Sequence, residues 1–174
     1  MALDQGMTYS MLLEVYLLSA VVRGILVTHQ ERLSNYLILR EGDEVFSLKK
    51  ANLELSDGKP VDVGSDEYLI YMQEVFLIAD MSSMPRTNRS GYEHLYVKKD
   101  ASNALLNIGP YWIRGDIHRL PGAPLHDLLL AKTRFIPVTD ATLIGRPAVE
   151  PRTYLVNRTK IGCMTAVGDG LIEF

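Results

Sequence analysis

VVRGIL at residues 21–26 and WIRGDI at residues 112–117 are the two stretches that decide the fold. Both are rich in branched apolar residues, and both contain an Arg-Gly pair, Arg23-Gly24 in the first and Arg114-Gly115 in the second. Runs of this composition are typical of β-strands, and a glycine inside a strand marks a bulge or a close backbone approach. A strand interrupted by an Arg-Gly pair is therefore predicted in both parts of the chain.

Three further pairs of segments match in the same order along the chain. They are LSNYLI (33–38) with LHDLLL (125–130), VFSLKKANL (45–53) with FIPVTDATL (135–143), and LIY (69–71) with YLV (154–156), followed by Phe76 with Ile161. The spacing changes only in polar or Gly/Pro-containing stretches, where a common fold tolerates changes of length. We expect a tandem duplication; the alternative is chance similarity between two β-rich halves.

Each copy is predicted to hold a strand, a short helix and further strands. Strands are expected at 18–27, 45–53, 111–118 and 135–143, helices at 33–39 and 125–131, and a long strand or a bent pair of strands at 68–79 and 154–164. The predicted fold is mainly β, with two small barrel-like or sandwich-like modules forming a pseudo-two-fold pair. The expected boundaries are residues 8–80, a linker at 81–103 with an edge strand at 93–98, residues 104–167, and a tail at 168–174.

Composition limits the function. The net charge of −3 and the pI of about 5.8 give no overall attraction to nucleic acid or to an anionic membrane. Cys163 is the single cysteine, so the chain can form no internal disulfide and no all-thiolate metal site, and its apolar surroundings predict a core thiol. The apolar run 11–27 is interrupted by Glu14 and Arg23. We expect a cytoplasmic protein without a membrane segment or a cofactor.

Five residues are candidates for binding. Arg23 and Arg114 could each grip a carboxylate or a phosphate, although an arginine beside a strand bulge is more often simply solvated. His118, His126 and Asp127 could form a site at the seam between the copies. Their spacing matches no known metal-binding motif and the first copy lacks them, so we predict no metal.

The sequence lacks the catalytic and phosphate-binding motifs that were sought. There is no Gly-x-Ser-x-Gly elbow, and Gly168-Asp-Gly170 lacks the third glycine of a dinucleotide fingerprint. No catalytic residues are therefore predicted. Basic residues cluster locally beside aromatic residues, for example Arg114 near Trp112, which is a pattern that small barrels use to bind single-stranded nucleic acid.

The stretch from Arg114 to Ala141, with RGDIH, LHDLL and RFIPVTDA, resembles an uncharacterised prokaryotic domain family. Members of that family have a strand with a glycine, a short helix and a Phe-Ile-Pro-Leu-Thr-Asp strand. The match is close in the second copy and loose in the first, which lacks the proline and the Thr-Asp pair. No activity is assigned to the family, so the resemblance implies a fold unit in a bacterial or archaeal cytoplasm and supplies no catalytic residues.

The leading hypothesis is a non-enzymatic interaction module that self-associates or binds a protein partner, because strand-rich surface is abundant and chemistry is not. The alternatives are a small-barrel protein that binds nucleic acid or nucleotides, and an enzyme of unfamiliar type with its site around His118, His126 and Asp127.

Overall fold

The computed structural model describes residues 7–62, 64–82, 99–146 and 150–167. The described residues form eleven strands, one α-helix and three 3₁₀ turns. In chain order these are β1 (Tyr9–Tyr16), β2 (Ala20–Thr28), α1 (Leu33–Leu39), β3 (Val45–Leu55), β4 (Pro60–Val61), β5 (Glu67–Tyr71), η1 (Met72–Glu74), β6 (Leu77–Asp80), β7 (Asp100–Ile108), β8 (Tyr111–Arg119), η3 (Leu125–Leu128), β9 (Phe135–Leu143), β10 (Arg152–Asn157), η4 (Arg158–Lys160) and β11 (Ile161–Ala166). The prediction of a mainly β fold is confirmed.

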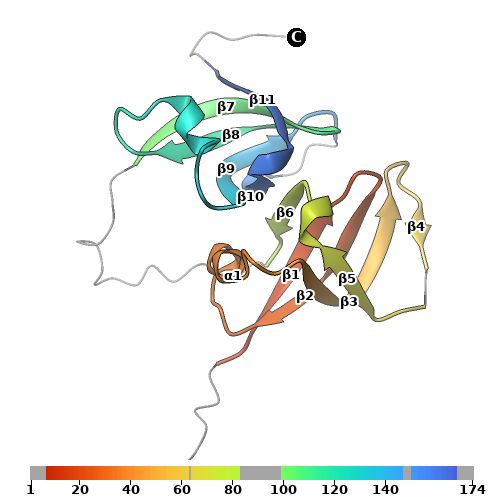
Figure 1. Cartoon of the computed structure of the whole chain (residues 1–174). Coiled ribbons are helices and arrows are strands. Elements are labelled where there is room, and N and C mark those ends of the chain that lie inside the picture. The colour runs from red at the N-terminus through yellow and green to blue at the C-terminus, as the bar shows by residue number, and fades with distance from the viewer. Residues whose placement is uncertain (1–6, 63, 83–98, 147–149, 168–174) are drawn as a thin grey trace, which may run out of the picture.

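All eleven strands belong to one antiparallel sheet. Its order is β11-β7-β8-β9-β10-β6-β1-β2-β3-β4, and β5 also pairs with β3. The sheet does not close into a barrel. Figure 1 shows β1 to β6 with α1 as one group and β7 to β11 as a second, the two meeting where β6 lies beside β10. The result resembles a sandwich in its layering.

Most of the predicted elements are present. Helix α1 has the predicted bounds, β9 does too, and the segment 68–79 is a bent pair of strands, because η1 turns the chain between β5 and β6. The predicted second helix is only the 3₁₀ turn η3. Three strands go beyond the prediction. They are β1, the two-residue β4, and β7, which begins inside the expected linker. The strand expected at residues 93–98 lies outside the described residues.

The strands pair in the same order in the first half (residues 7–82) and in the second half (residues 99–167). The path is β5-β3-β2-β1-β6 in the first and β10-β9-β8-β7-β11 in the second. The halves join through β6 and β10, which occupy different places in the two paths. A two-fold axis would pair strands of the same place, so a pseudo-two-fold pair is not shown. The duplication stays a prediction.

Both Arg-Gly pairs lie at a β-bulge, as the sequence predicts. The β2·β3 ladder shifts between Arg23 and Ile25, and the β8·β9 ladder shifts between Arg114 and Asp116. Opposite each bulge, a residue that is not glycine has a positive φ, 49° at Lys50 and 47° at Asp140. Glycine is required because a Cβ on Gly115 would lie 2.5 Å from the Cβ of Ala141. Bulges of this kind bend the strand and increase its local twist.

The two hydrophobic cores each contain side chains from both halves. The core under the first half includes Phe135 and Leu155 from the second. The core under the second half includes Tyr16, Val21, Phe76, Leu77 and Ala79 from the first. The halves therefore pack as one body, which small β units need if they are to bury enough apolar surface.

Candidate functional site

The outer face of β8 carries two of the five predicted binding residues. Arg114 is exposed, and its Nε donates to Oδ1 of Asn103 at 2.9 Å. The Nδ2 of Asn103 donates to Oδ1 of Asp116 at 3.0 Å. His118 lies farther along the same face, with its Nε2 2.7 Å from Oγ1 of Thr139. These side chains form a polar network on an open sheet surface.

The other two residues of the predicted seam site lie apart from His118. His126 and Asp127 are neighbours in η3, with 3.5 Å between Nε2 and Oδ1, and both are exposed. Among the described residues no hydrogen bond or ion pair joins them to His118. Across all the residues that the structure describes, no group of three or more His, Cys, Asp or Glu side chains is placed so that it could hold a metal ion.

Arg23 lies in a different environment, at the edge of a buried carboxylate. Its Nε donates to Oε1 of Glu14 at 2.6 Å, and its Nη1 donates to Oε2 of Glu54 at 3.0 Å. The hydrogen bond to Glu14 raises the pKa of the guanidinium above its ordinary value. Arg23 is thus paired with two carboxylates within the chain, so it is not simply solvated, and its role in binding a ligand stays a prediction.

Glu14 is the centre of the densest polar cluster at the seam. It is 7% exposed, and its Oε2 accepts from the Tyr16 hydroxyl at 2.7 Å and lies 3.6 Å from Nη1 of Arg152. Arg152 comes from β10, so the ion pair crosses the junction. Buried charges are tolerated only when they are paired and hydrogen-bonded, as Glu14 is. The described residues leave no buried side-chain polar atom without a partner.

Tyrosine rings fill the space around this cluster. Tyr16 packs edge-to-face against Tyr111 and Tyr154, at 5.5 and 6.0 Å between ring centroids. The guanidinium of Arg146 lies over the Tyr16 ring at 5.5 Å and over the Tyr111 ring at 5.8 Å. Burial raises the pKa of Tyr16 well above its usual range, with help from the Tyr154 and Glu14 charges, and burial also raises the pKa of Tyr154.

The cluster opens to a cleft of about 580 Å³ that both halves line. Glu14, Arg23 and Glu54 come from the first half, and Arg146 and Arg152 from the second. The seam thus does hold a cleft, and the predicted residue Arg23 lines it, but His118, His126 and Asp127, which were predicted to form a seam site, do not. The signals for it in the sequence were Glu14 and Arg23, the two charged residues inside the apolar run 11–27. Because Glu14 is already paired with Arg23 and with Arg152 of the other half, the cluster is suited to holding the two halves together.

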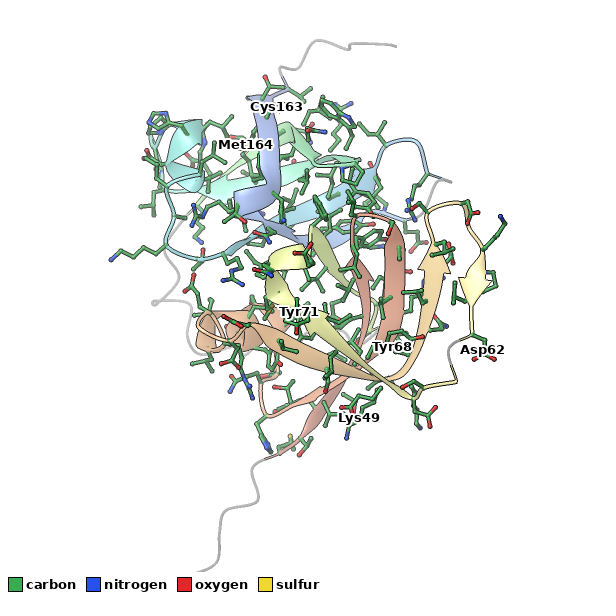
Figure 2. All side chains as sticks on the ribbon, turned by 45° about the vertical axis from the view of Figure 1, so that its right-hand side comes forward. Lys49, Asp62, Tyr68, Tyr71, Cys163 and Met164 are labelled. Atoms are coloured by element: carbon green, nitrogen blue, oxygen red, sulfur yellow. The ribbon has the colours of Figure 1, made fainter. Side chains whose placement is uncertain are left out.

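The edge strands of the sheet are the second candidate site, because an edge strand can bind a partner strand. At one end of the path, β11 pairs with β7 alone, and at the other, β5 and β4 pair with β3 alone, as far as the chain is described. Strand β11 reads IGCMTA and carries no charge. Cys163 is exposed on it, so the prediction of a core thiol was wrong. On β5, Leu69 and Tyr71 are 69% and 54% exposed. Figure 2 shows Cys163 and Met164 on β11, far from Tyr68 and Tyr71 on β5.

Comparison with protein-family models, with curated proteins and with solved structures finds no match. The resemblance to an uncharacterised prokaryotic family stays a prediction. No helix in the described ranges is long and apolar enough to cross a membrane.

Proposed function

We propose that this protein is a non-enzymatic assembly module that associates with copies of itself through its sheet. The observation that carries the proposal is the pair of open sheet edges described above. An edge strand presents unpaired backbone N–H and C=O groups, and sheet proteins usually protect such edges with charges, prolines or covering loops. Strand β11 has no charge and no proline, which supports a role in accepting another strand.

Exposed apolar side chains on the opposite edge support the same function. Leu69 and Tyr71 point outward from β5, where a solvated strand would be expected to carry polar groups. The Glu14 cluster supports a structural role for the polar seam, since its acceptors are occupied by Tyr16, Arg23 and Arg152. Neither feature requires a substrate.

The test is the mass of the purified protein in solution across a range of concentrations, measured by sedimentation velocity and by light scattering. Self-association gives species larger than the 19.5 kDa chain, and their proportion rises with concentration. A strict monomer at every concentration, with no protein co-purifying, would refute the proposal.

The second candidate is single-strand nucleic-acid binding, which one observation favours. Trp112 is 42% exposed and lies two residues before Arg114, on the same outer face of β8. An aromatic ring on which a base could stack therefore lies near a cation. Fluorescence anisotropy with single-stranded RNA and DNA at low salt tests it, with Trp112→Ala as the variant. Binding that does not weaken with salt, or that Trp112→Ala leaves unchanged, would remove this candidate.

A further inference from the structure

The junction between the two halves is a pairing of edges that the free edges of the molecule could repeat. In the first half, β6 is the outer neighbour of β1, and in the second half β11 is the outer neighbour of β7. Likewise β10 is the outer neighbour of β9, as β5 is of β3. Inside the chain, β6 and β10 pair with each other. Their counterparts β11 and β5 have no such partner in the described part of the chain.

The pairings fix which residues correspond on the outer strand of each half. Leu48 of β3 lies opposite Tyr68, and the matching Val138 of β9 lies opposite Tyr154. Tyr68 therefore takes the place of Tyr154, and Leu69 that of Leu155. This is one residue away from the match expected from sequence.

The same reasoning applies to the other outer strands. Val15 of β1 lies opposite Ile78, and Leu106 of β7 lies opposite Met164. Val15 and Leu106 correspond because β1 and β7 pair in the same way with β2 and β8. Met164 therefore takes the place of Ile78, and Cys163 takes the place of Leu77.

Exposure differs sharply between these corresponding residues. Leu155 is 5% exposed and Leu77 is 0% exposed, because each packs into the core of the other half across the junction. Leu69 is 69% exposed, and Cys163 is exposed as well. Leu69 and Cys163 thus occupy positions that the junction buries elsewhere in the molecule. A second junction of the same kind would cover both.

Side-chain size is also complementary at the end of this register. At the internal junction, the N–H of Asn157 donates to the carbonyl of Phe76 at 2.9 Å, so a small side chain lies by a large one. The corresponding residues of the free edges are Tyr71 and Gly162. The large side chain is now on β5 and the small one on β11, which leaves room for the exposed tyrosine.

We propose, resting on the self-association proposed above, that β11 of one chain pairs antiparallel with β5 of a second copy. The register places Thr165 opposite Tyr68, Met164 opposite Leu69, and Cys163 opposite Ile70. The two surfaces are unlike, so the contact is head-to-tail. A dimer formed in this way keeps one free edge of each kind, and assembly continues until it closes into a ring or extends as a filament.

Two single variants test the proposal, one for each edge. Leu69→Lys places a charge on the β5 edge and leaves β11 intact, whereas Cys163→Asp does the reverse. Each variant alone is expected to be monomeric by sedimentation velocity, and an equimolar mixture is expected to form a 1:1 heterodimer that grows no further. Leu39→Lys is the matched control, since Leu39 is also 69% exposed but lies on α1, and it should assemble like the wild type.

The outcomes separate this inference from the proposed function. A wild-type monomer refutes self-association itself. A wild-type oligomer that persists in both variants, or a Leu69→Lys protein that still forms dimers, overturns the head-to-tail pairing and leaves self-association standing. A mixture without heterodimer also overturns it, provided that thermal unfolding shows both variants to be folded.

The single cysteine gives a test on the wild-type chain that needs no variant of β11. Its reaction with a thiol reagent should slow by about tenfold or more as concentration rises and the chain assembles, because a paired strand reacts only when it opens. Leu69→Lys should abolish this protection. A thiol that reacts equally fast in the assembled wild type and in Leu69→Lys would refute the pairing.

Discussion

Replacing Gly115 by alanine should destabilise the protein by about 2–3 kcal/mol. The new methyl group would lie 2.5 Å from the Cβ of Ala141, 2.8 Å from its Cα and 2.8 Å from the carbonyl oxygen of Thr139. Carbon atoms pack best at about 3.5–4.0 Å, so β9 would have to move by about 1 Å. Overpacking of this kind typically costs about 1–3 kcal/mol, and the upper part applies because two of the three atoms are backbone.

Urea denaturation followed by circular dichroism, at one fixed protein concentration, measures this loss. The melting temperature should fall by roughly 4–12 °C for a chain of this size. Gly24→Ala, where the nearest atoms lie at 2.8 and 2.9 Å, should cost somewhat less. Gly42→Ala is the control, because nothing lies within 4 Å of its Cβ position. If Gly115→Ala unfolds within about 0.5 kcal/mol of Gly42→Ala, the bulge does not require glycine and the packing argument fails.

Three further changes test the seam and the core. Because burial raises the pKa of Tyr16 in the folded state, its phenol favours folding below about pH 10, and stability should fall as pH rises above that value. Urea midpoints between about pH 8 and 11 should show a shallower fall for Tyr16→Phe; an equal fall would be inconsistent with a raised pKa. Glu14→Gln should lower the free energy of unfolding by about 1–3 kcal/mol in urea denaturation, which is less than for a fully buried ion pair because the arginine partners of Glu14 are partly exposed. The control Glu54→Gln should lower it by about 0–1 kcal/mol. Equal losses in the two variants would contradict the central role of Glu14. Asn157→Ala should cost about 2–3 kcal/mol because the carbonyl of Val75, which accepts from Nδ2 at 2.7 Å, loses its partner in the core; a thermal melt unchanged from wild type would argue against this bond.

Local patterns in the sequence predicted the local structure well. The strands on either side of each bulge and helix α1 were found because apolar spacing and an Arg-Gly pair are visible within a few residues. Strand β1 was missed because Glu14 interrupts an otherwise uniform apolar run, and such runs have no clear period. Strand β7 was missed because three of its first four residues, Asp100, Ser102 and Asn103, are polar and were interpreted as linker.

Contacts between distant strands could not be predicted. Glu14 of β1 pairs with Arg152 of β10 only because β6 lies between these two strands in the sheet. Nothing in the sequence fixes which sheet edges meet. Of the predicted site residues, Arg23 does lie at the seam, while His118, His126 and Asp127 are spread over β8 and η3. Cys163 was placed in the core because its strand is apolar, but an edge strand has fewer neighbours to cover it.

Each hydrophobic core contains side chains from the other half, and this affects how the two halves can evolve. Leu77 and Ala79 would be left bare if the second half were removed, and Phe135 and Leu155 would be left bare if the first half were removed. Neither half is a portable part that recombination could move alone into another protein. Because these side chains pack against the opposite half, we expect substitutions at these positions to be accompanied by changes in that half.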